Sequence, residues 1–226
     1  MHQSVLLLDL DGTLCDPREG FENCIGYALE KMALPLNGWE HFHTHIGPPL
    51  ETTLGVILGR ENAHRVPEAA AFYRERYRIK GIEENLVYPG IPEVLASLSR
   101  QYTLLLATSK PLIFAERILE QLGLVSWFSG VYGAGPDGKD SAKALVIRNA
   151  LRQENLAAEA CVMIGDRRHD VDGATANDMA ACAVSWGYGS REELSAAKPR
   201  AIFETPGEMA SFFLQGNLSQ QKVRTA

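Results

Sequence analysis

Two aspartates, Asp9 and Asp11, directly follow a short apolar run near the start of the chain. The run, Val5 to Leu8, has the composition of a strand buried on both faces, and Gly12 marks a point where such a strand would turn. Two carboxylates that are brought together and desolvated repel each other unless a cation offsets their charge. The pair therefore predicts a cation-dependent site at the end of this strand, against the alternative of a solvated turn.

Polar side chains also follow two later apolar runs. Thr108 ends one run, Asp166 ends another, and Asp170 lies four residues further on. Because ligands of an open parallel sheet gather at the carboxyl ends of its strands, we expect these side chains to meet the first two aspartates at one edge. Carboxylates and a hydroxyl suit a hard cation, and Mg²⁺ takes one or two carboxylates together with a substrate phosphate. With a lysine added, the set predicts a phosphoryl-transfer site.

The elements that would position these residues alternate between strands and helices. This alternation is typical of a doubly wound, Rossmann-like α/β fold with a parallel sheet. Strands are expected at 5–8, 102–107, 131–133, 160–164, 180–185 and 201–203, and helices at 111–122, 141–152 and 170–177.

The long segment after the first strand lacks a strand pattern and is predicted to be helical. Apolar side chains recur at helical spacing from Phe21 to Met32, and further helices are expected over 50–58 and from Pro67. The expected domains are an α/β core formed by residues 1–15 and 87–226 and an inserted α-helical cap formed by residues 16–86.

The segment Asp9-Leu10-Asp11-Gly12-Thr13 resembles the nucleophile motif DxDGT of the haloacid dehalogenase superfamily, and the later motifs of that family follow in order. The helical segment is similar to the small cap of its phosphoglycolate phosphatase-like and 5'-nucleotidase-like members. The resemblance implies a phosphomonoester hydrolase with Mg²⁺ as cofactor. Its partner would be a small phosphorylated metabolite: phosphoglycolate, a nucleoside monophosphate or a sugar phosphate.

The resemblance also implies a role for each matching residue. Asp9 would attack phosphorus and form an aspartyl-phosphate, and Asp11 would protonate the leaving group and then activate water. Thr108 would hydrogen-bond the phosphoryl group, and Lys143 would offset the charge on that group and on the nucleophile. The implied metal ligands are Asp9, Asp11, Asp166 and Asp170, of which the last is either a direct ligand or a supporting acid.

Several alternatives stay open at this point. Lys139 competes with Lys143 for the lysine role, while Thr108, Asp166 and Asp170 could instead cap the helices that follow them. The same fold could also serve a phosphomutase, or a regulatory module without turnover.

Two further patterns suggest other functions. Residues 133–140 nearly match the phosphate-binding loop GxxxxGK[ST] of a nucleotide kinase, but Asp140 replaces the hydroxyl and Pro136 removes a backbone N–H. Three histidines alternate within residues 41–45, and in an extended segment they would share one face, as in a zinc site. The alternative for the histidines is an ordinary polar surface.

Composition excludes other classes. The 226 residues carry a formal net charge of -6, which argues against nucleic-acid binding, and no apolar stretch is long enough for a membrane span. No secretory signal is expected.

The four cysteines, Cys15, Cys24, Cys161 and Cys182, are too sparse for a disulfide framework and are predicted to be small core side chains. We expect a cytoplasmic monomer or weak homodimer, with a frayed polar tail from Gln215.

Overall fold

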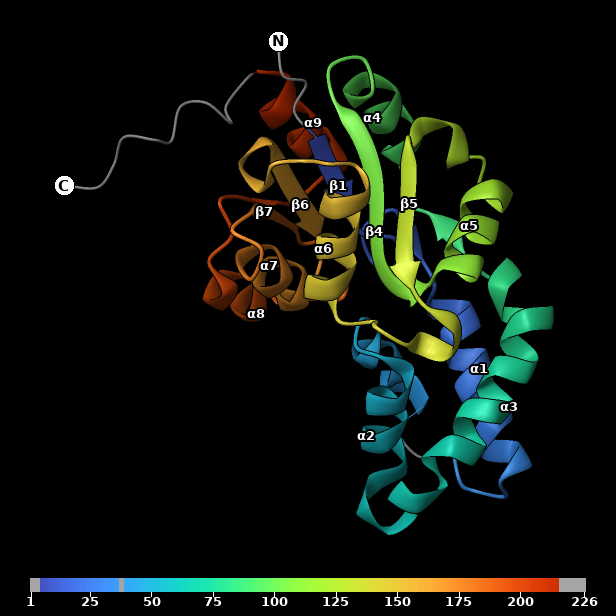
Figure 1. The fold of residues 1–226 in the computed structure, drawn as a ribbon. Coiled ribbons are helices and arrows are strands. Elements are labelled where there is room, and N and C mark those ends of the chain that lie inside the picture. The colour runs from blue at the N-terminus through green and yellow to red at the C-terminus, as the bar shows by residue number, and fades with distance from the viewer. Residues whose placement is uncertain (1–4, 37–38, 216–226) are drawn as a thin grey trace.

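A parallel sheet forms the centre of the molecule (Figure 1). The computed structural model describes residues 5–36 and 39–215. The strands of this sheet are β1 (Val5–Leu8), β4 (Thr103–Pro111), β5 (Gly130–Ala134), β6 (Cys161–Gly165), β7 (Ala180–Val184) and β8 (Ile202–Phe203). Their order is β5-β4-β1-β6-β7-β8, and every neighbouring pair is parallel. The doubly wound α/β fold is thus confirmed.

Helices cover both faces of the sheet, which explains why β1 is apolar throughout. One face packs against α6 (Lys143–Gln153) and α7 (Arg168–Thr175). The other packs against α4 (Ile91–Leu98), α5 (Leu112–Gln121) and α9 (Pro206–Leu214), and α8 (Arg191–Ala197) lies beside α7. Val5 and Leu7 face the first set and Leu6 and Leu8 the second, so a polar residue anywhere in β1 would be buried.

A helical insertion, the elements between β2 and β3, lies beyond the end of the sheet toward which the strands point (Figure 1). Its helices are α1 (Arg18–Lys31), α2 (Leu50–Asn62) and α3 (Val66–Ile79), linked by the 3₁₀ turns η1 (Trp39–His45), η2 (Ala63–Arg65) and η3 (Gly81–Glu83). Their apolar faces form a core of their own, which includes Phe21, Ile25 and Leu54. The insertion therefore packs as a unit, with its own hydrophobic stabilisation.

Two short strands join the insertion to the sheet. β2 (Cys15–Asp16) pairs antiparallel with β3 (Leu86–Val87). The expectation of no strand within 16–86 is therefore wrong at both ends of that segment. Strands of two residues are too short to show the alternating pattern by which strands are detected in a sequence.

Helix α2 breaks just after residue 58, where the predicted helix ends, but it then resumes. It continues to Asn62 across a kink at Gly59, where φ is +66°. Glycine takes this conformation without the steric penalty of a Cβ atom, so the chain bends there and resumes its helix.

The remaining 3₁₀ turns are η4 (Val125–Trp127), η5 (Pro136–Gly138) and η6 (Ala158–Ala160). All four cysteines are free and buried, as predicted. No helix among residues 5–36 and 39–215 is long and apolar enough to cross a membrane. The polar tail beyond Gln215 lies outside the described residues.

Candidate active site

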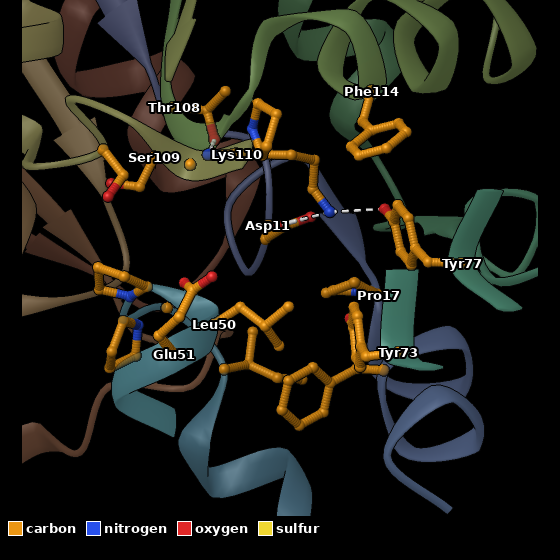
Figure 2. Close-up of a pocket in the computed structure, with 18 of the residues that line it drawn as sticks. Asp11, Pro17, Leu50, Glu51, Tyr73, Tyr77, Thr108, Ser109, Lys110 and Phe114 are labelled. Atoms are coloured by element: carbon orange, nitrogen blue, oxygen red, sulfur yellow. Dashed lines mark hydrogen bonds and ion pairs between the residues drawn. The ribbon is translucent and has the colours of Figure 1, made fainter. Parts of the chain in front are cut away.

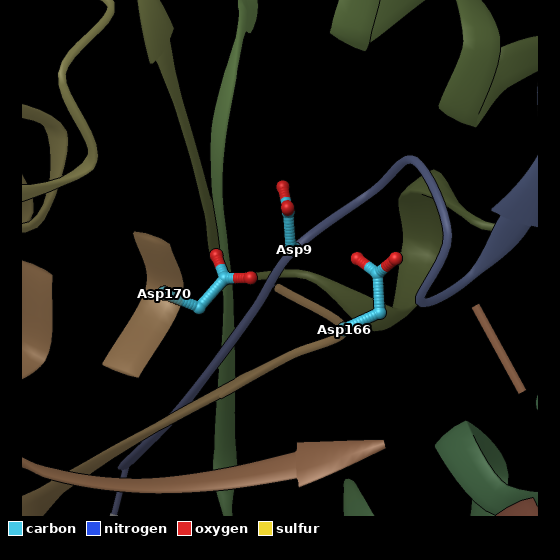
Figure 3. Close-up of side chains that lie close together, drawn as sticks. All are labelled: Asp9, Asp166 and Asp170. Carbon is cyan, nitrogen blue, oxygen red and sulfur yellow. The ribbon is translucent and has the colours of Figure 1, made fainter. Parts of the chain in front are cut away.

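Three aspartates converge where the strands end, as the sequence predicts. Asp9 follows β1, Asp166 follows β6, and Asp170 lies in the first turn of α7. Each offers a carboxylate oxygen, and these oxygens lie within 4.8 Å of one another (Figure 3). This group, called here the aspartate cluster, could hold a metal ion.

Asp166 is fixed in the cluster by hydrogen bonds from two directions. The Tyr188 backbone N–H donates to its Oδ2 at 2.8 Å, and the Thr13 hydroxyl lies 3.5 Å from its Oδ1. Its carboxylate also lies where a Cβ atom on Gly12 would be, and Gly12 has a φ of +79°. The glycine of the opening motif is therefore required both by the turn and by the close approach of Asp166.

Burial and like charge act together on the cluster. Burial, followed by the neighbouring Asp170 and Asp9 carboxylates, raises the pKa of Asp166 well above its usual value. Burial also raises the pKa of Asp170 to about 6, although Lys143 opposes this shift. A divalent cation would offset this repulsion, and carboxylate oxygens are ligands that hard cations prefer, so the residues fit a metal such as Mg²⁺.

Lys143 lies against two members of the cluster. Its Nζ is 2.8 Å from Asp9 Oδ1 and 2.8 Å from Asp170 Oδ1, and it donates to the Ala107 carbonyl at 2.9 Å. Burial alone would lower the pKa of Lys143, but the two carboxylates outweigh burial and raise it, so the side chain is a cation. Lys139, the competing candidate, is exposed.

Asp11 is in a different environment from Asp9. Its carboxylate is not part of the aspartate cluster, and its Oδ2 lies 2.9 Å from Lys110 Nζ. Its Oδ1 is buried and has no hydrogen-bond partner in the described part of the chain. Burial raises the pKa of Asp11, against the opposing effect of Lys110. The structure thus separates the two aspartates of the motif into unlike surroundings.

The strand that carries Thr108 is longer than predicted. β4 does not end at Ala107 but continues to Pro111 through a shift in its register with β5. Thr108 is buried and accepts a hydrogen bond from the Lys110 backbone N–H at 3.2 Å. Its side chain does not cap α5, which follows Pro111. The irregular strand end instead turns Thr108, Ser109 and Lys110 toward the site.

Of the two aspartates that could instead have capped a helix, Asp170 does so and Asp166 does not. Asp170 accepts a hydrogen bond from the Arg167 backbone N–H at 3.1 Å, which stabilises the start of α7. It therefore has a capping role and also pairs with Lys143. Asp166 lies before the N-cap residue Arg167 and does not cap the helix.

A pocket opens from the cluster toward the helical insertion (Figure 2). It encloses about 130 Å³, with Asp9, Asp11 and Thr108 at its polar end. Its other walls are mainly apolar and aromatic side chains from both parts of the molecule, namely Phe21, Ile46, Leu50, Tyr73, Tyr77 and Phe114. The shape admits a small molecule with one polar end and an apolar body.

Sequence reasoning missed two residues that reach the site. Lys110 lies between Asp11 and Tyr77, and Tyr77 comes from α3 of the insertion (Figure 2). Lys110 follows Thr108 by two residues, which was the available signal. The regular spacing of Tyr73 and Tyr77 indicated only a helix face.

The three alternating histidines do not lie in an extended segment. They lie in the 3₁₀ turn η1, so the expectation of a shared face is wrong. His43 Nδ1 is 3.0 Å from Glu22 Oε1, and no group of metal-ligating residues occurs there among the described side chains.

The near-match to a kinase loop also has a different structure. Its backbone N–H groups bond within the loop itself: Gly135 N–H donates to Lys139 O at 2.7 Å and Gly138 N–H to Gly135 O at 3.2 Å. Donors that are already bonded in this way cannot also cradle a phosphate.

The fold and the site define an α/β protein with an acidic centre at one end of a pocket. A family model described as haloacid dehalogenase-like hydrolase matches residues 6–184. The chain therefore belongs to the haloacid dehalogenase-like hydrolases, and it is a phosphatase of that family. Its similarity to enzymes named 5'-nucleotidase and phosphoglycolate phosphatase confirms the predicted branch.

Individual relatives support this assignment. A 5'-nucleotidase of Pseudomonas aeruginosa is 44% identical over 198 residues, which cover 86% of this chain and 88% of that protein. The crystal structure of a predicted phosphatase from Clostridium acetobutylicum has a TM-score of 0.87 at 36% identity and covers 94% of this chain and 99% of that one. The tyrosine-protein kinase PtkA of Mycobacterium tuberculosis is 38% identical over 187 residues, covering 82% of this chain but 63% of that protein.

Proposed function

We propose that the chain hydrolyses small phosphomonoesters through a covalent aspartyl-phosphate on Asp9. One observation carries the proposal: Asp9 lines the pocket while Lys143 Nζ, 2.8 Å away, lies between it and Asp170. The ammonium would offset negative charge on the phosphoryl group as that group approaches the carboxylate. A carboxylate with such a partner at the polar end of a pocket is suited to attack phosphorus.

We propose Mg²⁺ as the cation of the aspartate cluster. Asp9 and Asp166 would be its side-chain ligands, while Asp170, already bonded to Lys143 and to the Arg167 N–H, would support the site from behind. When bound, Mg²⁺ would neutralise charge on the phosphoryl oxygens. The side chain of Asp11 would stay outside this group, bound to Lys110.

Asp11 would transfer the protons. In the first step a bond forms between Asp9 and phosphorus, the bond from phosphorus to the leaving oxygen breaks, and the Asp11 proton passes to that oxygen. In the second step water attacks phosphorus, Asp11 takes its proton, and Asp9 is released with inorganic phosphate. The raised pKa of Asp11 suits a group that must hold a proton before the first step.

Nucleoside 5'-monophosphates are the substrate class that we propose first. The pocket walls are aromatic and apolar, and its cations Lys110 and Arg74 each have a carboxylate partner, Asp11 and Glu51. A planar base suits such walls better than the carboxylate of phosphoglycolate, which would need a cation to pair with. The similarity to a 5'-nucleotidase points the same way.

Phosphate release from a panel of nucleoside monophosphates, phosphoglycolate and sugar phosphates tests the proposal, with Mg²⁺ and with a chelator. Asp9→Asn is expected to abolish release, whereas Asp172→Asn, an exposed carboxylate on α7, is expected to leave it unchanged. Equal activity of Asp9→Asn and wild type would exclude Asp9 as the nucleophile. A higher kcat/KM for phosphoglycolate would overturn the substrate class, and transfer to an alcohol or tyrosine acceptor in place of water would favour a phosphotransferase.

A further inference from the structure

Lys110 connects the proposed proton donor to the helical insertion. Its Nζ lies 2.9 Å from Asp11 Oδ2 and donates a hydrogen bond of 2.8 Å to the Tyr77 hydroxyl (Figure 2). The same ammonium lies 5.0 Å from the centre of the Tyr77 ring. With a side chain only 11% exposed, Lys110 has little freedom to leave these partners for water.

The Tyr77 side chain and the backbone of Lys110 are both held in place by neighbouring residues. The Tyr77 ring stacks on Tyr73 at 5.7 Å between centroids and meets Phe114 edge-on at 5.3 Å. Burial raises the pKa of Tyr77 to about 12, so its hydroxyl keeps its proton over the working range of pH. The backbone of Lys110 is tied to Thr108 at the irregular end of β4.

The contact with Lys110 gives the two carboxylate oxygens of Asp11 different surroundings. Oδ2 is bound to Lys110, whereas Oδ1 is buried, has no hydrogen-bond partner among the described residues, and belongs to a side chain that lines the pocket. Since a carboxyl rotates freely when neither oxygen is held, a bond to one oxygen decides which way the other points. Oδ1 is therefore the oxygen left for a leaving group.

We propose that Tyr77 is a positioning residue for proton transfer: it holds Lys110 against Asp11 Oδ2, and this presents Asp11 Oδ1 to the leaving oxygen. Because Tyr77 belongs to the insertion and Asp11 to the sheet, the arrangement exists only while α3 is docked beside β4. Docking of the insertion over the substrate would then assemble the acid as well as exclude water. This inference rests on the proposed role of Asp11.

The dependence of the rate on the leaving group distinguishes a positioning role of Tyr77 from a purely structural one. An alkoxide leaving group needs a proton to depart, whereas p-nitrophenolate departs with little help. In Tyr77→Phe the ring packing is kept and the hydroxyl is lost. We expect kcat/KM, which covers the steps up to formation of the aspartyl-phosphate and not its hydrolysis, to fall about ten-fold for a nucleoside monophosphate and less than about two-fold for p-nitrophenyl phosphate.

Two other variants sharpen the comparison. Lys110→Met should lose activity on the nucleoside monophosphate selectively, as Tyr77→Phe does, but by a larger factor. Lys110→Arg keeps a charged donor and should therefore lose less of that activity than Lys110→Met. Tyr73→Phe, on the same pocket wall beside Tyr77, is expected to affect the two substrates alike. Thermal unfolding of each variant shows whether it is folded.

The outcomes are distinct. A parallel loss of kcat/KM on both substrates in Tyr77→Phe, or no loss on either, overturns the positioning role. If Asp9→Asn keeps wild-type activity, the proposed function itself fails. If Asp9→Asn is inactive but Tyr77→Phe loses kcat/KM in parallel on both substrates, only the role of Tyr77 fails.

Discussion

Lys143 and Asp9 form a buried ion pair, with Nζ 2.8 Å from Oδ1. The Lys143 side chain is 3% exposed, and its remaining donors bond to Asp170 and to the Ala107 carbonyl. A single ammonium thus links the residue after β1, the middle of β4 and the first turn of α7. This arrangement makes Lys143 important for stability as well as for the proposed chemistry.

Replacing Lys143 is expected to damage both properties. Lys143→Met leaves two buried carboxylates without their cation, so the free energy of unfolding should fall by about 3 kcal/mol. Phosphatase activity should be lost as well, because the ammonium proposed to offset charge on the approaching phosphoryl group is removed from beside Asp9. Urea denaturation and phosphate release measure the two effects. Lys139→Met, an exposed lysine nearby in the sequence, serves as the control and should change neither. The reverse pattern would assign the lysine role to Lys139.

Gly12 provides a test of the geometry without any change in functional groups. Gly12→Ala introduces a Cβ atom at a φ of +79° and in the space of the Asp166 carboxylate. We expect it to cost about 1–2 kcal/mol through the backbone alone, and to lose Mg²⁺-dependent activity through displacement of Asp166.

Gly123→Ala is the matched control for this substitution. Gly123 has a similar φ of +68°, but a Cβ atom there meets no other atom within 4 Å. It should therefore show the backbone cost and keep its activity. Normal activity in Gly12→Ala would mean that Asp166 does not need its present position.

Metal binding should depend on pH in a definite direction. The pKa of the proposed ligand Asp166 is raised, so a proton competes directly with the cation there, and protonation of Asp170, whose pKa is about 6, removes a negative charge beside the cation. We expect the Mg²⁺ dissociation constant, measured by calorimetry, to fall as the pH rises from about 5 to 7. If binding displaces one proton, the constant should fall about ten-fold for each pH unit. Asp172→Asn should follow the wild-type profile. A dissociation constant that does not change over this range would contradict the assignment of the cluster as the metal site.

Arg167 is expected to control substrate affinity. Its guanidinium donates a hydrogen bond to the Ile46 carbonyl, next to the pocket residues Gly47 and Pro48, and its Nε lies 2.9 Å from Glu193 Oε1. Arg167→Ala should release this loop from the sheet and raise KM by about ten-fold, with a smaller change in kcat. Steady-state kinetics measure both. Arg168→Ala, an exposed neighbour paired with Asp172, should leave KM unchanged; an equal rise in KM would show that loop anchoring is not the cause.

The carboxyl ends of β1 and β6 were the most predictable part of the site, whereas the end of β4 was not. β1 is buried on both faces, so its sequence is continuously apolar, and the first polar residue after it, Asp9, marks its carboxyl end. The same reasoning located Asp166. Because carboxyl ends of parallel strands share one edge of the sheet, the cluster of aspartates followed from the sequence alone.

Contacts between distant segments could not be predicted in this way. Lys110 and Tyr77 are 33 positions apart, and their contact depends on how α3 packs against the irregular end of β4. No local periodicity encodes that packing. The division of labour between Asp9 and Asp11 was likewise implied only by family resemblance, since the two side chains look equivalent until Lys143 and Lys110 are seen beside them.

The central claim is that Asp9 carries the phosphoryl group during turnover. The most direct measurement is mass spectrometry of the enzyme after acid quenching during turnover of a nucleoside monophosphate with Mg²⁺. A single phosphoryl group is expected on the peptide that contains Asp9 in the wild-type enzyme, and none in Asp9→Asn. A phosphoryl group on another residue, or full activity in Asp9→Asn, would contradict the claim.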